Sequence, residues 1–363
     1  MVAWSLTEIL NGCTTYEPLL SKHPHTAVQY GLVFILVLTN PNEMKGKSLL
    51  SDCFSKDTGV RERFLQNLYA SQTQIRDAYE NNRQEKDYLS PDLARANRWV
   101  AEKRDDFVPP FTGVRDFTIP FEALQPHMKW SNFLKTWAVH EHKGQADLAI
   151  GDAKLMLEGL ERGEFGDLAY ARAAVGFWPV FSTPEDHLLF YSDTSCSKVV
   201  LDLAMERDLL RHRDGSFNTC LTDFVVQENP AHTPVYVGLF LLTSSSPGLE
   251  QLAANYHGKG DVYSELLLKT LLDVLAEACS EYLHGILMVF PGGTKRGIRP
   301  AFGYPSCPDH ALKKPVVRLL QTKKDVGISL TSSFMLQPAS SVCGMYFGHP
   351  QAFYFTVNKP HNP

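Results

Sequence analysis

The residues best suited to chemistry lie in the stretch RGIRPAFGYPSCPDH, at positions 296–310. Its three prolines fix φ at about −65° and restrict the residues before them, so a stiff, irregular loop is predicted rather than a helix. Such a loop has little entropy left to lose when a ligand binds. Arg299 would then offer a preset guanidinium fork to a carboxylate or phosphate, and Tyr304 a flat ring and a hydroxyl. The same spacing suits a structural turn in which Arg299 forms an ordinary salt bridge.

A second segment, positions 327–357, combines small residues with the sequence GMYFGHP, which predicts a strand followed by a turn. Four of its residues would let another part of a structure approach the backbone closely; they are Ala339, Ser340, Ser341 and Gly344.

The clearest helix is predicted over 265–284, shortly before the loop. Its apolar residues recur at helical spacing, which indicates one face packed in the core. Charged residues step by four along the other face, which we expect to be solvated; they are Glu265, Lys269, Asp273, Glu277 and Glu281. Further along the chain, buried strands are predicted at 187–192 and 233–243, a helix over 61–86 and an extended linker over 87–110.

Composition narrows the class of protein. The 363 residues are 44% hydrophobic and 21% charged, which is typical of one large globular domain or two smaller ones. A net charge of −5 without a basic block argues against a nucleic-acid partner. The longest apolar run, 30–38, is too short for a membrane-spanning helix and is predicted to be a buried strand. Seven cysteines without a CxxC pair, and no secretory signal, favour the cytoplasm and free thiols.

GIRPAFGYPSCPDH and SLTSSFMLQPASSVCGMYFGHPQAFYF together resemble the activation domain of cobalamin-dependent methionine synthase. Further matching motifs are WSNFLKTW, FNTCLTDFV, YVGLF and LAEACSEYLH. The resemblance covers roughly residues 50–357. It implies an α+β fold with a bent, largely antiparallel sheet flanked by helices. Residues 1–52 resemble the end of a cobalamin-binding domain, 53–110 would be a helix and linker, 111–357 the main domain and 358–363 a tail.

The resemblance implies a function as well. The family's domain binds S-adenosylmethionine for the reductive methylation of cob(II)alamin in methionine biosynthesis. Cobalamin would be held by a partner domain, and a flavodoxin or a methionine synthase reductase-like protein would donate the electron. The chain would hold no metal and no catalytic side chain, and would position the methyl donor.

Site residues follow from the same resemblance. Arg299 would bind the ligand's carboxylate, while the backbone of Pro300 and Ala301 and the ring of Tyr304 would line its adenosyl side. Tyr346 and Phe347 match ligand-contacting positions of the family.

Several departures oppose this assignment. Lys129 stands where the family has a ligand-contacting aspartate, and Gly293 where it has a glutamate. The cobalt-ligating Asp-x-His-x-x-Gly motif and the folate and homocysteine domains are absent from this sequence. The alternative is therefore a truncated or divergent, non-enzymatic paralogue that keeps the fold, has lost tight S-adenosylmethionine binding, and binds a protein or another ligand.

Two other candidates are weaker. His140-Glu141-His142 would place two imidazoles on one face of a strand, as a metal site requires, but no third ligand is evident. Asp223 is expected to cap or pin the core rather than to catalyse a reaction.

Overall fold

The computed structural model describes residues 87–101, 107–137, 143–166, 168–229, 232–289, 296–321 and 326–360, with scattered helical positions between 59 and 77. The chain divides into two compact units, residues 1–85 and 86–363. The helix expected over 61–86 is helical at each position described there. The predicted strand 30–38, the motif His140-Glu141-His142 and Gly293 lie outside the described residues.

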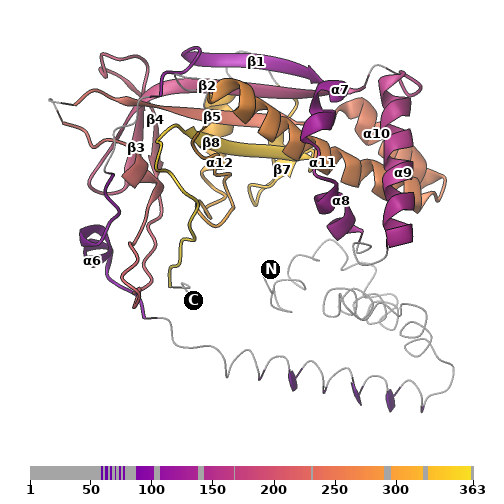
Figure 1. The fold of residues 1–363 in the computed structure, drawn as a ribbon, viewed down its shortest axis with the longest axis horizontal. Coiled ribbons are helices and arrows are strands. Elements are labelled where there is room, and N and C mark those ends of the chain that lie inside the picture. Colours follow the sequence, from indigo (N-terminus) through magenta and orange to yellow (C-terminus); the bar gives the residue numbers. More distant parts are fainter. Residues whose placement is uncertain are drawn as a thin grey trace. The chain divides into compact units, whose positions relative to one another are not determined.

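An antiparallel sheet forms the centre of the second unit (Figure 1). Its strands are β1 (Gly113–Pro120), β2 (Tyr170–Ser182), β3 (His187–Tyr191), β4 (Val199–Ala204), β5 (Val235–Thr243) and β8 (Ser341–Phe347). The order is β4-β3-β2-β5-β8, and every pairing is antiparallel. The long β2 pairs with β5 along one edge, so its other edge is shared between β1 and β3. A short hairpin, β6 (Ser329–Leu330) and β7 (Leu336–Gln337), precedes β8.

Helices cover the sheet and one of its ends (Figure 1). They are α6 (Pro91–Ala96), α7 (Phe121–Leu124), α8 (Trp130–Thr136), α9 (Lys143–Glu161), α10 (Pro247–Gly258), α11 (Val262–Leu287) and α12 (Lys313–Leu320), with short 3-10 turns at Gln125–His127 and Leu221–Phe224. Because side chains alternate along a strand, the sheet buries two apolar faces. Phe240 and Tyr346 pack with α11 on one face, whereas Leu239, Met345 and Phe347 pack with α12 on the other.

The fold expected from the resemblance is confirmed as mixed helix and antiparallel sheet. The predicted strands at 187–192 and 233–243 and the helix at 265–284 correspond to β3, β5 and α11. The extended linker predicted over 87–110 is wrong in part, because α6 lies within it. Ser90 accepts a hydrogen bond from the backbone N–H of Leu93, and Pro91 opens the helix, so the segment carries a recognisable helix start.

A buried ionic cluster ties distant segments together. The guanidinium of Arg207 donates to Asp186, at 2.5 Å, and to Asp223, at 2.8 Å, and all three side chains are almost fully buried. Asp223 also accepts from the backbone N–H of Cys220. The expectation that Asp223 pins the core is confirmed.

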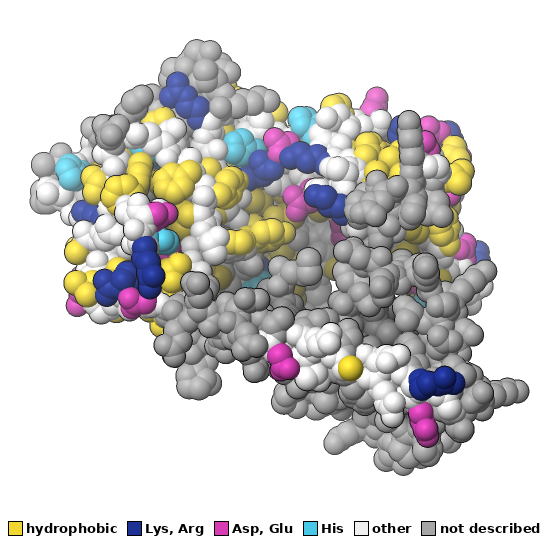
Figure 2. All heavy atoms as spheres, turned by 60° about the horizontal axis from the view of Figure 1, so that its bottom comes forward, with side chains coloured by type: hydrophobic (Ala, Val, Ile, Leu, Met, Phe, Trp, Pro, Cys, Tyr) yellow, Lys and Arg dark blue, Asp and Glu magenta, His cyan; other side chains and the backbone are white. Residues whose placement is uncertain are grey.

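The mixed surface charges and the free cysteines agree with what the composition predicts. Figure 2 shows basic and acidic side chains mixed in small groups on one face, beside two hydrophobic areas. Every cysteine in the described part of the chain is a free thiol. Within that part, no helix is long and apolar enough to span a bilayer.

Candidate functional site

The loop at 296–310 extends the edge of the sheet beside β8. Ile298 and Phe347 exchange backbone hydrogen bonds of 3.1 and 3.0 Å. Two residues further on, the backbone N–H of Met345 donates to the carbonyl of Pro300 at 2.9 Å. The edge strand β8 thus gains a partner, and the loop is fixed on it without becoming a regular strand.

Two glycines make this arrangement possible. A Cβ on Gly344 would lie 2.7 Å from the carbonyl oxygen of Pro300 and 2.7 Å from the ring of Phe240. Gly303 has a φ of +93°, and a Cβ there would lie 2.3 Å from the ring of His310. We expected another segment to approach the backbone closely at Gly344, and that segment is the loop at 296–310.

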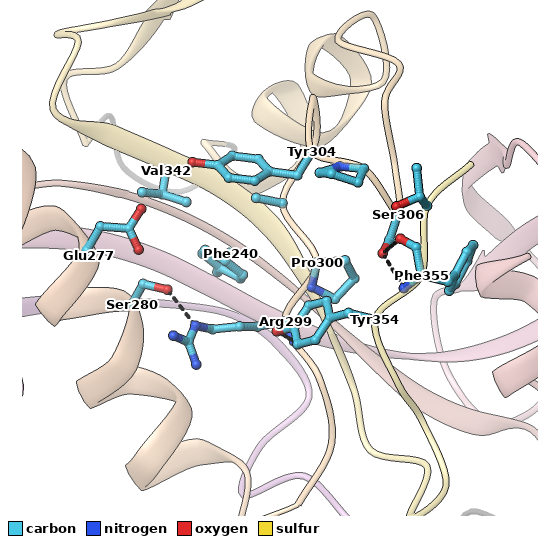
Figure 3. A pocket seen from close by; sticks show the side chains of 13 residues that line it. Phe240, Glu277, Ser280, Arg299, Pro300, Tyr304, Ser306, Val342, Tyr354 and Phe355 are labelled. Carbon is cyan, nitrogen blue, oxygen red and sulfur yellow. Dashed lines mark hydrogen bonds between the residues drawn. The ribbon is translucent and has the colours of Figure 1, made fainter. Parts of the chain in front are cut away.

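A cavity of about 410 Å³ lies beside the loop (Figure 3). Its walls come from α11, β5, β8, the loop and the C-terminal segment. The lining residues are Phe240, Glu277, Ser280, Arg299, Pro300, Ala301, Tyr304, Pro305, Ser306, Val342, Tyr354, Phe355 and Thr356. Aromatic rings and one carboxylate thus face the same space as a guanidinium.

Arg299 is held by several contacts at this cavity. Its Nε donates to the hydroxyl of Ser280 at 3.0 Å, and its Nη2 donates to Oε2 of Glu281 at 2.6 Å. Its backbone N–H donates to the hydroxyl of Tyr354 at 3.0 Å. The side chain is 20% exposed, so it is mostly enclosed yet reaches the cavity. The salt-bridge interpretation is confirmed by the ion pair with Glu281. Arg299 also lines a hollow, and its role as a fork for a ligand carboxylate stays a prediction.

A second cavity of about 240 Å³ adjoins the first and shares Glu277 and Arg299 with it. The remaining lining residues come from the region of α8 and from α11; they are His127, Lys129, Asn132, Thr136, Thr270, Asp273, Val274 and Glu281. Asp273, Glu277 and Glu281 therefore line cavities. Asp273 and Glu277 are exposed, as the predicted solvated stripe requires, whereas Glu281 is partly buried beside Arg299.

Charge and burial set the protonation of these groups. Partial burial opposes ionisation of Glu281, but the charges of Arg299 and Lys129 outweigh it and keep the pKa of Glu281 below its usual range. Burial raises the pKa of Asp273, although Ser340 donates a 2.6 Å hydrogen bond to its carboxylate. Partial burial, followed by the negative charge of Glu277, raises the pKa of Tyr304, whose ring is largely exposed.

The structure brings together four of the residues expected from the resemblance, since Arg299, Pro300, Ala301 and Tyr304 line the first cavity. Lys129 lines the second cavity and is 62% exposed.

Tyr346 and Phe347 do not line either cavity. As neighbours on β8 they point to opposite faces of the sheet, and both side chains are buried. The ring of Tyr346 stacks on Phe240 with centroids 4.7 Å apart, so it supports a cavity wall from behind.

The sequence reasoning missed the other lining residues of the first cavity, among them Tyr354, Glu277 and Ser280. Tyr354 lies in the quoted motif QAFYF, but nothing in its spacing indicated a contact with the loop. Glu277 and Ser280 lie in LAEACSEYLH, one turn apart on α11. Because both residues lie on one face of the predicted helix, shortly before the arginine loop in the sequence, their spacing could have indicated that they face the loop.

Comparison with known proteins decides the family. The model of the activation domain of vitamin B12-dependent methionine synthase matches residues 114–288 and 293–362. The chain belongs to this family. Among solved structures, a MetH reactivation domain bound to AdoHcy is similar to it, with 28% sequence identity and a TM-score of 0.67. That match covers 75% of this chain and 90% of the other.

The site thus belongs to an activation domain, on the segment that the family match spans. The loop, α11 and β8 that form the first cavity all lie within the matched residues. In the described part of the chain, no group of three or more His, Cys, Asp or Glu side chains is arranged to hold a metal ion.

Proposed function

We propose that this activation domain binds S-adenosylmethionine in the cavity beside Arg299 and presents its methyl group for reductive methylation of cob(II)alamin. One observation carries the proposal, namely that a stiff loop holds a guanidinium at the wall of a nucleoside-sized cavity. The solved relative bound to AdoHcy supports it.

The chemistry of the cavities matches the parts of this ligand. A carboxylate would pair with Arg299, because a guanidinium binds carboxylates by charge-assisted hydrogen bonds. The sulfonium and ammonium groups are positive and would lie near Glu277 and Asp273, which line the cavities. The adenine would pack against the exposed rings of Tyr304 and Tyr354. Glu277 and Asp273 would thus take over from the acidic residues that the family has at positions 129 and 293.

The chain's own role would be to bind and orient the methyl donor rather than to transfer a proton. Cobalamin, which accepts the methyl group, would be held by a partner cobalamin-binding domain. An electron would come from a flavodoxin or a methionine synthase reductase-like protein. Such a system would operate in the cytoplasm and serve methionine biosynthesis.

Calorimetric titration of the full chain with S-adenosylmethionine and S-adenosylhomocysteine tests the proposal. We expect micromolar binding that weakens at least tenfold in Arg299→Ala, since a charged hydrogen bond contributes about 1.5–3 kcal/mol. Arg318→Ala removes an exposed arginine of α12 that lines neither cavity and should bind normally. No heat at millimolar ligand with the unaltered chain would refute the assignment.

The second candidate is the divergent, non-enzymatic paralogue, and one observation favours it. Arg299 already has a carboxylate partner in Glu281, and Lys129 brings a further positive charge close to that pair. A domain that keeps the fold but has lost tight S-adenosylmethionine binding would show no ligand heat while unfolding cooperatively.

A further inference from the structure

A single carboxylate oxygen lies between two cations at the junction of the two cavities. Oε2 of Glu281 is 2.6 Å from Nη2 of Arg299 and 3.7 Å from Nζ of Lys129. All three residues line the second cavity, and Arg299 also lines the first. Glu281 therefore occupies Nη2, one of the two terminal nitrogens that a ligand carboxylate would bind.

We propose that Lys129 is a positioning residue, which retains Glu281 when Arg299 exchanges Glu281 for the carboxylate of the ligand. This inference rests on the proposed binding of an adenosyl amino acid at Arg299. Lys129 itself makes no contact with the ligand.

The exchange follows from charge. A guanidinium that is already neutralised by Glu281 attracts a second carboxylate less, and two carboxylates beside one guanidinium repel each other. A ligand carboxylate that binds both terminal nitrogens of Arg299 would therefore displace Glu281, which is 38% exposed, from Nη2. The displaced carboxylate needs a cation, and the ammonium of Lys129 already lies near the same oxygen.

Other groups near Glu281 fit this role less well. His284 also lowers the pKa of Glu281, but its influence ranks below those of Arg299 and Lys129. His127 lines the same cavity, and its ring packs edge-on against Tyr282. The hydroxyl of Ser280 still accepts from Nε of Arg299 after the exchange, so the guanidinium keeps its orientation.

The test is a double-mutant cycle with Lys129→Met, Glu281→Gln and the double variant, titrated calorimetrically with S-adenosylhomocysteine. 5′-Methylthioadenosine is the second probe, because it keeps the nucleoside and lacks the amino-acid end. Lys135→Met is the matched control, since Lys135 is exposed on the same helix α8 and lines neither cavity.

Lys129→Met should weaken S-adenosylhomocysteine binding about threefold, as expected for a partly exposed ion pair. The same change should have no effect in the Glu281→Gln background, where no carboxylate has to be retained. Glu281→Gln alone should bind at least as tightly as the unaltered chain. Affinity for 5′-methylthioadenosine should stay constant in all variants, and Lys135→Met should match the unaltered chain with both probes.

The outcomes that would overturn the inference differ in meaning. A Lys129→Met effect that persists beside Glu281→Gln would make Lys129 a direct ligand contact. Weaker binding in Glu281→Gln alone would mean that Glu281 only orients Arg299. If the unaltered chain binds neither S-adenosylhomocysteine nor S-adenosylmethionine, the proposed function fails as well; if it binds and the cycle shows no coupling, only the exchange fails.

Discussion

Gly344→Ala isolates the contact that holds the arginine loop on the sheet. The added methyl group would lie 2.7 Å from the carbonyl oxygen of Pro300 and 2.7 Å from the ring of Phe240. Real Cβ atoms do not approach other atoms so closely, so the loop has to move away from β8. The first hydrogen bond at risk runs from the backbone N–H of Met345 to the carbonyl of Pro300.

The cost can be worked out from these contacts. Overpacking of a tight site costs about 1–3 kcal/mol, and the loss of one backbone hydrogen bond about 0.5–1.5 kcal/mol. The free energy of unfolding should therefore fall by about 2–4 kcal/mol, which lowers the Tm of a unit of this size by about 5–10 °C. S-adenosylhomocysteine affinity should fall too, because Arg299 and Tyr304 lie on the displaced loop.

Urea unfolding, thermal melting and calorimetric titration of the full chain measure these effects. Gly151→Ala is the matched control, since nothing lies within 4 Å of a Cβ at that position in α9. That change should stabilise the chain by about 0.5–1 kcal/mol, through the higher helix propensity of alanine. An unchanged Tm and unchanged affinity in Gly344→Ala would show that the loop does not depend on close packing at β8.

Three further predictions concern other parts of the unit. Arg207→Met leaves the buried carboxylate of Asp223 without a guanidinium and Asp186 with only Arg95, so it should cost about 3–5 kcal/mol in urea unfolding. Arg211→Met breaks an exposed ion pair with Asp87 and should cost less than about 1 kcal/mol. Tyr346→Phe removes a buried hydroxyl that has no hydrogen-bond partner among the described residues, so the free energy of unfolding should stay equal or rise by about 1 kcal/mol. The affinity for S-adenosylhomocysteine should be retained, and a clear loss of affinity would instead make the hydroxyl a ligand contact. Burial and the charge of Lys313 lower the pKa of His310, so the stability contributed by neutral His310 should be full above about pH 6.5 and lost as the pH falls through the lower folded-state pKa. Urea unfolding at pH 7.5 and 5.5 should show this loss of stability in the unaltered chain. The same loss in His310→Gln would disprove the assignment to His310.

Local pattern was enough to predict the elements that position the site. The 3.6-residue spacing of apolar residues predicted α11, and the apolar run at 233–243 predicted β5. The prolines and glycines of 296–310 predicted an irregular loop rather than a helix, which is confirmed, and backbone hydrogen bonds fix this loop on β8. The resemblance supplied the antiparallel character of the sheet, which no local pattern contains, whereas the strand order came only from the structure.

The lining of the cavities was predictable only in part, because it depends on which parts of the fold meet. Charges spaced by four along a helix predict one polar face, but they do not say whether solvent or another segment covers it. Arg299 of the loop pairs with Glu281 on that face, Glu277 stays exposed at the cavity wall, and the C-terminal segment brings Tyr354 to Arg299. Because side chains alternate along a strand, Tyr346 and Phe347 on β8 face opposite sides of the sheet and do not both point into one cavity. This geometry decides their positions, whatever their match to ligand-contacting positions of the family.

The charges around the cavities bear on whether Lys129 abolishes binding. The side chains of Lys129 and Arg299 bring two positive charges, and those of Asp273, Glu277 and Glu281 bring up to three negative ones. If Glu281 neutralises one cation, Glu277 and Asp273 remain to attract a sulfonium or an ammonium. Because burial raises the pKa of Asp273, an approaching cation would also favour ionisation of that carboxyl. Under the proposed function, a lysine at position 129 would therefore change which carboxylates meet the positive end of the ligand, and Glu277 and Asp273 would remain to attract it.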